Sequence, residues 1–522
     1  MGARKACESR YVLLILFCCK RNRKTVSRAL WRADVVAPSR ALRTILLFRV
    51  SPPILASNAL RRPMPFPEKL EVPTVLEDFD RFGANESASN GWRVDSLLNA
   101  DFALCSTYPQ TLAIPATAPT AVIKAAAAYR SRQRLPVLSW RDAVGTGTLV
   151  RAAQPCTSVL HKRSKADEEY LAHCFRASGA SKLCLIDARS LAAAHANKFR
   201  GGGVEQAQRY GARAVEFCAL RNVHKVRRVI RALREQPSAQ QDGDGPSPAA
   251  LTSWLRLQAA LLRAAVRTAR LLQAGAMVFL HCSDGWDRTP QISALAQVLL
   301  DPFYRTHVGF LTLIDKEWLA FGHRFQLRHI LAQPIFLQFL DAVYQLLRQQ
   351  PQAFAFSPDY LADILALHDG TPPGGGAVAF PRFPFDCDHD AQRVASASAG
   401  PADASHWAAP LVADASRAAA YANPAYSAPG QSMAAAPLEV LHVDARHIAL
   451  QLWEPVRQPV SRTSNVGIAK GSVLACCWPS RAARERQHLA DTESEATHVR
   501  VSPGKRRGLP EEELAGIELK EQ

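Results

Sequence analysis

The segment from His281 to Thr289 has the sequence HCSDGWDRT and combines a cysteine with an arginine at C-x5-R spacing. A thiolate requires positive surroundings near neutral pH, and a planar guanidinium binds two phosphate oxygens at once through bidentate hydrogen bonds. A tight loop between Cys282 and Arg288 would add backbone N–H donors. The spacing therefore predicts a cysteine nucleophile directed at a phosphorus atom.

The sequence on both sides of this segment favours that chemistry over a chance match. C-x5-R spacing by itself arises by chance in a chain with 12 cysteines. Here the apolar run Met277–Leu280 predicts a buried strand, and Pro290 followed by regularly spaced leucines and alanines predicts a helix. In the order strand, loop, helix, the unpaired N–H groups of the helix start favour both a bound phosphate and a thiolate.

Together with residues 291–301 and 304–306, this segment resembles the active-site region of the myotubularin-related phosphatases. Further matching segments occur in the order found in the family: residues 92–93, 104–109, 134–141, 187–189, 196–198, 201–203, 222–224, 316–318, 321–328 and 334–341. The resemblance covers residues 75–365 well and extends weakly toward residue 460. It implies an α/β fold of the protein-tyrosine-phosphatase type, with a central mixed sheet flanked by helices and a strand–phosphate loop–helix active site.

The resemblance also implies roles for residues of the loop. Cys282 would form a cysteinyl-phosphate while Arg288 and the loop amides hold the phosphate oxygens. Asp287 would be the general acid that protonates the leaving oxygen. The substrate-binding residues implied within the loop are Ser283, Asp284, Gly285 and Trp286. For both aspartates the alternative is a purely structural role in the loop, and Thr289 either donates to the sulfur or caps the helix.

Four residues outside the loop are implied by the resemblance as ligands of a phosphoinositide headgroup. Arg324 and Arg328 are spaced i, i+4, and on a helix they would project from one face toward the headgroup phosphates. Asn197 and Asn222 would donate to the diester phosphate, with a turn beside the following glycines as an equal alternative for Asn197. The implied substrates are phosphatidylinositol 3-phosphate and phosphatidylinositol 3,5-bisphosphate. The chain departs from the family after Arg328, where a short connection of residues 329–333 leads to the next shared segment.

Composition excludes several other classes of protein. The 522 residues are 48% hydrophobic, enough for a sizeable core, and the longest apolar run, Tyr11–Cys19, is shorter than the roughly 18–20 residues that span a bilayer. A basic stretch follows this run where a signal-peptide cleavage site would lie, which argues against secretion. The cysteines are scattered, without C-x2-C pairs or zinc-like spacing, so we expect a reducing compartment and neither metal nor cofactor. By resemblance, the protein would be cytoplasmic and bind peripherally to endosomal membranes.

The positive charge concentrates near the N-terminus. The net charge is +18, and residues 1–70 contain fifteen Lys or Arg against three Asp or Glu. We therefore expect a basic segment at residues 1–71, with the lipid-binding domain of pleckstrin-homology type that the family carries there absent or truncated. Such a segment attracts anionic lipid, whereas the lack of interleaved aromatics argues against a nucleic-acid partner.

The remaining boundaries follow from local composition. We expect the phosphatase domain at residues 72–460, interrupted by a solvated loop at residues 236–250 and by a poorly ordered stretch at residues 371–437. Residues 461–522 are predicted to form a disordered, charged tail. Within the domain the pattern predicts helices at residues 120–129 and 251–274, and strands at residues 134–138, 183–186 and 277–280.

Three functions remain open at this stage. The first is a phosphoinositide 3-phosphatase acting on membrane lipids, and the second is a protein tyrosine or dual-specificity phosphatase that uses the same loop. The third is a catalytically weak adaptor that associates with itself or with active myotubularin-like proteins. The presence of Cys282, Asp287 and Arg288 argues against the adaptor, and the arginine pair at 324 and 328 argues for a lipid headgroup.

Overall fold

The structure is a computed structural model that describes residues 66–67, 71–85, 90–235, 247–370, 408–413, 415–428 and 439–457. At its centre is a five-stranded sheet with strand order β3-β4-β7-β5-β6. The strands are β3 (Val137–Arg141), β4 (Thr148–Ala152), β5 (Leu183–Asp187), β6 (Val215–Phe217) and β7 (Met277–His281). The pair β3–β4 is antiparallel, and the other neighbours are parallel. A separate antiparallel pair consists of β1 (Trp92–Asp95) and β2 (Leu112–Pro115).

Strand β7 lies in the middle of the sheet, and all five of its residues are buried. Parallel strands covered by helices on both faces are typically continuous apolar runs, which explains why Met277–Leu280 is so apolar. In the register of the sheet, His281 lies beside Ala152 of β4 and Asp187 of β5. The carboxyl ends of these three strands therefore meet at one edge, where open α/β sheets commonly place their ligands.

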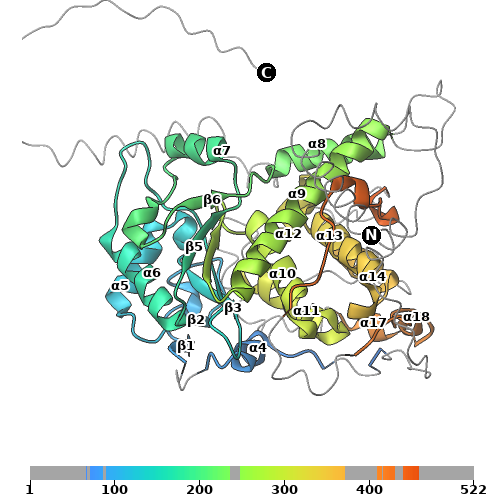
Figure 1. Cartoon of the computed structure of the whole chain (residues 1–522), viewed down its shortest axis with the longest axis horizontal. Helices are drawn as coiled ribbons and strands as arrows, with labels where there is room; N and C mark the ends of the chain where they lie inside the picture. Colours follow the sequence, from blue (N-terminus) through green and yellow to red (C-terminus); the bar gives the residue numbers. More distant parts are fainter. Residues whose placement is uncertain are drawn as a thin grey trace, which may run out of the picture. The chain divides into compact units, whose positions relative to one another are not determined.

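Helices cover both faces of the sheet (Figure 1). Helices α5 (Thr120–Tyr129) and α6 (Lys165–Ser178) lie on one side, and α9 (Pro248–Gln273) and α10 (Arg288–Leu300) lie on the other. The predicted mixed α/β class and the order strand, loop, helix are confirmed. Helix α9 begins earlier than expected because Pro248 occupies its first turn, where its missing N–H costs no hydrogen bond. The predicted loop at residues 236–250 is therefore wrong for its last three residues, and residues 236–246 lie outside the described part.

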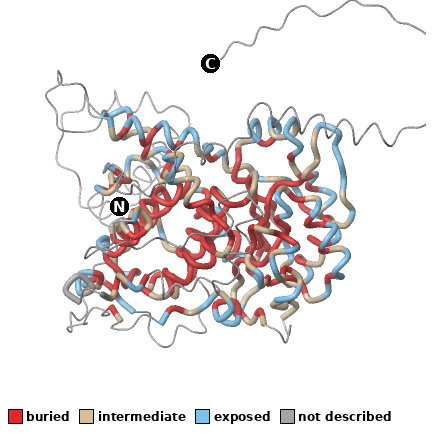
Figure 2. The backbone as a smooth tube through the Cα atoms, turned by 180° about the vertical axis from the view of Figure 1, so that it is seen from behind, coloured by how far each residue is buried: buried red, intermediate tan, exposed pale blue. Residues whose placement is uncertain are grey.

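The chain after α10 forms a helical layer that supports the carboxyl edge of the sheet. It contains α11 (His307–Ile314), a π-helical turn (Asp315–Ala320), α12 (Phe325–Ile330), α13 (Ile335–Gln349) and α14 (Pro358–His368). Trp318 is fully buried, with ring centroids 4.9 Å from Phe339 and 5.1 Å from Phe336. The shorter helices are α4 (Val75–Arg81), α7 (Leu191–Ala196) and α8 (Val223–Arg234). Buried residues concentrate in the sheet and in the long helices beside it (Figure 2).

Part of the stretch predicted to be poorly ordered is packed on this layer. Residues 408–413 and 415–428 include the short helices α17 (Pro410–Ala413) and α18 (Ala415–Ala420). Tyr421 is buried and donates a hydrogen bond to Asp363 at 2.8 Å. The prediction for residues 371–437 is wrong there. It is based on the alanine-rich composition, whereas the buried ring of Tyr421 packs this segment against the helical layer. The predicted basic segment, apart from residues 66, 67 and 71, and the predicted tail at residues 461–522 lie outside the described residues.

In the part of the chain that the structure describes, no helix combines the length and the apolar character needed to cross a membrane.

Candidate active site

The C-x5-R loop, residues 282–288, connects the end of β7 to the start of α10. Cys282 is 2% exposed and lies at the base of the loop, where the Gly285 N–H donates to its Sγ atom at 3.3 Å. Gly285 has a φ of +77°, and a Cβ at this position would lie 2.5 Å from the carbonyl oxygen of Ala152. The loop therefore requires glycine here, both for its backbone conformation and for its close approach to β4.

Arg288 starts α10, two residues before the Pro290 that was expected to open it. Its Nη2 donates to Ser283 Oγ at 3.3 Å, while its Nε is buried without a hydrogen-bond partner. The hydroxyl of Thr289 is likewise buried without a hydrogen-bond partner. It neither caps the helix nor donates to the Cys282 sulfur, so both alternatives for Thr289 are wrong. Each buried unpaired polar group costs about 1–3 kcal/mol. The unpaired Nε belongs to the Arg288 side chain that already contacts the loop through Nη2, so it is a candidate donor to a phosphate oxygen.

Asp287 is buried in the same loop and is held by Arg328. The Arg328 Nε and Nη2 donate to its two carboxylate oxygens at 2.9 and 2.7 Å. Burial raises the pKa of Asp287, but the charge and hydrogen bonds of Arg328, followed by His323 and Arg288, lower that pKa below its usual value. In this state the carboxyl group is ionised at neutral pH, and Arg328 is already engaged.

His323 connects the helical layer to the loop. Its Nδ1 donates to the Trp286 carbonyl at 2.6 Å and lies 3.5 Å from Asp287 Oδ1. Burial lowers the pKa of His323 to about 4, so the ring is neutral at physiological pH and carries its proton on Nδ1. His323 therefore fixes the loop backbone beside Asp287, a contact that the sequence pattern did not indicate.

Arg324 does not share a helical face with Arg328. Helix α12 begins at Phe325, and Arg324 precedes it with φ −82° and ψ 63°, so the i, i+4 prediction is wrong. The Arg324 guanidinium instead lies over the ring of buried Trp286, 5.3 Å from its centroid. Both arginines still reach the loop, one at Trp286 and the other at Asp287.

The opposite side of the loop is held by the ends of neighbouring elements. Asn197 donates to Ser283 Oγ at 3.0 Å, and Ser131 donates to Asp284 Oδ1 at 2.8 Å. The backbone N–H of Gln154, just beyond β4, donates to the Ser283 carbonyl at 2.9 Å. These contacts place Asn197 at the loop and give Asp284 a positioning partner.

Asn222 is engaged elsewhere. It is the N-cap of α8, and its side chain accepts a hydrogen bond from the Lys225 N–H at 3.0 Å. Capping of this kind stabilises a helix by about 1 kcal/mol. The role of Asn222 as a headgroup ligand stays a prediction.

Two buried arginines that sequence analysis did not single out set the shape of the loop. Arg134 and Arg151 donate to the Gly285 carbonyl at 3.1 and 2.8 Å. Arg151 also pairs with buried Glu317 at 2.7 Å. In a trans peptide the C=O and the next N–H point in opposite directions, so the Trp286 N–H points away from these arginines. The sequence did contain an indication of this contact, because Arg151 is a charged residue inside an apolar strand and such a residue requires a buried partner.

His281, which precedes the cysteine, lies at one end of a buried ionic network. Its Nε2 is 3.0 Å from Glu205 Oε2, and its Nδ1 is 3.0 Å from the Cys282 carbonyl. Glu205 in turn pairs with Arg130. Burial lowers the pKa of His281, but Glu205 raises that pKa above its usual value. The Glu205 carboxylate lies close to one ring nitrogen and the Cys282 carbonyl close to the other, and the raised pKa favours an imidazolium next to Cys282.

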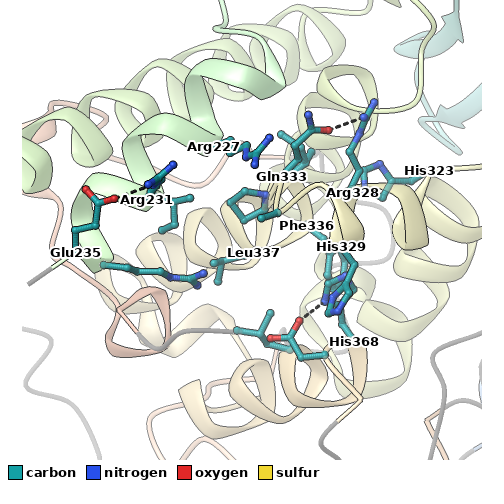
Figure 3. Close-up of a pocket in the computed structure, with 17 residues that line it drawn as sticks. Arg227, Arg231, Glu235, His323, Arg328, His329, Gln333, Phe336, Leu337 and His368 are labelled. Carbon is teal, nitrogen blue, oxygen red and sulfur yellow. Dashed lines mark hydrogen bonds and ion pairs between the residues drawn. The ribbon is translucent and has the colours of Figure 1, made fainter. Parts of the chain in front are cut away.

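A cavity of about 560 Å³ opens beside Arg328, below α8 (Figure 3). His329, Ala332 and Gln333 of the short connection 329–333 line it, and Gln333 accepts a hydrogen bond from Arg328 Nη1 at 2.6 Å. This connection therefore steadies Arg328. It also forces Ala332 into a left-handed conformation with φ +49°, which ordinarily costs about 1–2 kcal/mol.

Comparisons with known proteins identify a family and several relatives. The chain matches the myotubularin-like phosphatase domain over residues 58–369. It is 41% identical over 313 residues to the phosphatidylinositol-3,5-bisphosphate 3-phosphatase MTMR2 of Bos taurus, covering 56% of this chain and 46% of that protein. The corresponding Mus musculus protein is 41% identical over 326 residues, covering 58% and 48%. Myotubularin of Xenopus laevis is 38% identical over 314 residues, covering 58% and 51%. The chain thus spans about half the length of the curated relatives it matches.

The fold and the site define a class of mixed α/β domain that carries a buried cysteine and an arginine on one tight loop between a strand and a helix. The family match covers more than half of the chain. This protein belongs to the myotubularin-like phosphatase family, as the sequence resemblance predicted.

Proposed function

We propose that this protein removes the 3-phosphate from phosphatidylinositol 3-phosphate and from phosphatidylinositol 3,5-bisphosphate through a cysteinyl-phosphate intermediate. The single observation that carries the proposal is the C-x5-R loop, which joins a buried thiol to an unpaired buried N–H of Arg288. The MTMR2 relatives are named as phosphatidylinositol-3,5-bisphosphate 3-phosphatases, which supports the choice of substrate.

The first step transfers the phosphoryl group to Cys282. The thiolate attacks phosphorus, the S–P bond forms, and the bond between phosphorus and the inositol oxygen breaks. Arg288 and the loop N–H groups stabilise the charge that builds on the phosphoryl oxygens. Asp287 donates its proton to the departing inositol oxygen, so that an alcohol leaves.

The second step returns the enzyme to its starting state. The Asp287 carboxylate accepts a proton from water, and the water oxygen attacks the phosphorus of the intermediate. The S–P bond breaks, inorganic phosphate leaves and the Cys282 thiolate is regenerated. One aspartate serves as acid and then as base, as microscopic reversibility permits.

The ion pair between Asp287 and Arg328 links substrate binding to the first step. A phosphate of the arriving headgroup competes for the Arg328 guanidinium, which binds phosphate as well as carboxylate in a bidentate manner. When Arg328 turns to the headgroup, its charge and hydrogen bonds no longer lower the pKa of Asp287, and burial, the largest single influence, favours uptake of a proton from water. Substrate binding thereby favours the protonated Asp287 that the first step requires.

The wider assignments follow from this proposal. The phosphatase domain spans residues 72–460 and has the protein-tyrosine-phosphatase fold, with the basic segment 1–71 before it and the tail 461–522 after it. It acts as a peripheral protein on endosomal membranes facing the cytoplasm, and associates with itself or with other myotubularin-like proteins. Of the headgroup ligands, Arg324 and Arg328 bind the additional phosphates, and Asn197 and Asn222 bind the diester.

A substrate panel tests the proposal. The purified chain is offered short-chain phosphatidylinositol 3-phosphate, the 3,5-bisphosphate, the 4- and 5-monophosphates and phosphotyrosine peptides, and released phosphate is measured. We expect turnover of the two 3-phosphorylated lipids, complete loss in Cys282→Ser, and retained turnover in the matched control Cys156→Ser, which changes a partly buried thiol outside the loop.

Two other results would replace the proposal. Faster turnover of phosphotyrosine peptides than of the 3-phosphorylated lipids would make the protein a tyrosine phosphatase. Absence of turnover on the whole panel, combined with stable binding to an active myotubularin-like phosphatase in gel filtration, would make it an adaptor.

A further inference from the structure

Two surface segments next to the C-x5-R loop expose apolar side chains that the proposed chemistry does not use. They are residues 156–163 and residues 190–203, the second of which contains α7, and we call them together the α7 face. Phe199 is 85% exposed and Leu160 is 74% exposed. Val159 and Leu191 are exposed as well. Single exposed apolar residues are ordinary, whereas several on adjoining segments mark an interaction site.

The two segments are joined to each other by hydrogen bonds. The Ser158 N–H donates to the Gly202 carbonyl at 2.9 Å, and Thr157 Oγ1 donates to the same oxygen at 3.3 Å. These contacts hold the turn that bears Leu160 beside the turn that bears Phe199. Helix α7 projects from the carboxyl edge of the sheet, and its backbone is mostly exposed (Figures 1 and 2). The α7 face is therefore one continuous surface.

The charges of the α7 face all have one sign. Its two segments contain Lys162, Arg163, Lys198 and Arg200 and no Asp or Glu. Arg163 pairs with Glu168 on the adjacent helix α6. Apolar side chains among cations without acidic residues match the requirements of an anionic lipid surface, where the cations lie over lipid phosphates and the apolar groups enter the interface.

A cavity of about 420 Å³ opens at the base of this face. Lys162 and Arg200 line it together with Ser131 and Gln154. The last two residues hold the C-x5-R loop through Asp284 and Ser283 respectively. The basic cavity thus extends from the exposed apolar side chains toward the loop.

We propose that the α7 face docks on the surface of an anionic phospholipid bilayer. Phe199 and Leu160 enter the interface between headgroups and acyl chains, while Lys162, Lys198 and Arg200 lie over lipid phosphates. Because Asn197 in the same segment donates to Ser283, docking brings the bilayer surface to the C-x5-R loop. The inference deepens the proposed function and rests on it for the presence of substrate in the bilayer, but the docking itself requires no catalysis.

Co-sedimentation of the full chain with vesicles that lack phosphoinositides tests the docking directly. Phosphatidylcholine vesicles with and without phosphatidylserine are compared for the wild type and for the double variant Phe199→Glu, Leu160→Glu. We expect the wild type to prefer vesicles with phosphatidylserine, and the double variant to partition roughly tenfold more weakly. Hydrogen exchange in residues 156–163 and 190–203 should slow when vesicles are added to the wild type.

Val144→Glu is the matched control. Val144 is 77% exposed and lies between β3 and β4. Because Thr148 pairs with Met277, this connection lies at the amino end of β7, on the edge of the sheet opposite the loop. The control should bind vesicles within about twofold of the wild type. Thermal unfolding followed by circular dichroism should show that all three proteins are folded.

Three results would overturn the inference. They are equal vesicle binding by the wild type and the double variant, equal losses in the double variant and in Val144→Glu, and exchange in the two segments that vesicles do not slow. If the double variant instead dissociates a dimer in sedimentation equilibrium, the face is an interface between copies of this chain. Vesicle binding without turnover of any lipid would sink the proposed function and leave the docking intact.

Discussion

Asn in place of Asp287 tests whether this side chain supplies the proton to the leaving group. Asp287 is the buried carboxylate inside the C-x5-R loop, and its amide counterpart keeps a similar shape and one acceptor for Arg328. General acid catalysis contributes about 10²–10⁴-fold in rate, which corresponds to about 2.7–5.4 kcal/mol of barrier. The loss should depend on the leaving group, because an inositol alkoxide requires a proton and a nitrophenolate does not.

The assay compares kcat for short-chain phosphatidylinositol 3-phosphate with kcat for p-nitrophenyl phosphate. For Asp287→Asn we expect a loss of about 10²–10⁴-fold on the lipid and less than about tenfold on the aryl ester. Asp284→Asn is the matched control, because an amide there still accepts the hydrogen bond of Ser131 and both losses should stay below about tenfold. Equal losses on both substrates in Asp287→Asn would refute the acid role.

Folding must be measured in the same variants. Breaking a buried ion pair by removing one partner costs about 3–5 kcal/mol, and Asp287→Asn removes the charge that faces Arg328. The Arg328 side chain is 13% exposed and keeps its hydrogen bond to Gln333, so the loss should lie at or below the lower end of that range. Urea unfolding at the assay temperature shows whether the variant is folded when its kcat is determined.

Three further predictions follow from the described contacts. Arg328→Gln removes the cation that lowers the pKa of Asp287, so burial raises that pKa and the alkaline limb of kcat/KM for short-chain phosphatidylinositol 3-phosphate should move to higher pH. An unchanged limb on this substrate would contradict the pairing. Ala332→Gly relieves the left-handed strain and should raise the free energy of unfolding by about 1 kcal/mol in urea titrations. A free energy of unfolding below that of the wild type would mean that the strain is small. Glu205 raises the pKa of His281 in the folded state, so the stabilisation by the imidazolium is present below the unfolded pKa of about 6.5 and is lost as pH rises through the folded pKa. Glu205→Gln should therefore destabilise by about 3 kcal/mol at pH 6 and by less at pH 9 in urea unfolding, and a loss independent of pH would show that His281 is neutral.

Secondary structure near the site could be predicted because local pattern decided it. The apolar run 277–280 can only be buried, and β7 includes all of it. Helix α5 matches its predicted residues, and α9 differs by three residues at its start and one at its end. The strand predicted at residues 134–138 begins later, at Val137, because Arg134 is held by side-chain hydrogen bonds to Thr107 and to the loop. An ionic contact made by residues far apart in the sequence therefore changed a local pattern.

The headgroup arginines show where sequence spacing fails. Spacing of i, i+4 places two side chains on one face only when both residues are helical, and Arg324 precedes the helix that contains Arg328. The turn before α12 is fixed by His323, whose ring is buried and bonded to the Trp286 carbonyl. No local pattern contains that bond, since its partners are 37 residues apart.

The sequence by itself determined the chemistry that the site can perform, because the cysteine, the aspartates and the arginine are separated by only a few residues and one loop brings them together. It also determined the strand and the helix that hold this loop, because hydrophobic periodicity is a local property. Tertiary structure decided the state of the groups: which carboxylate Arg328 holds, which ring nitrogen of His323 carries the proton, and which arginines hold the Gly285 carbonyl. The physical reason is that charge and burial depend on neighbours brought together by folding, and those neighbours are distant in the sequence.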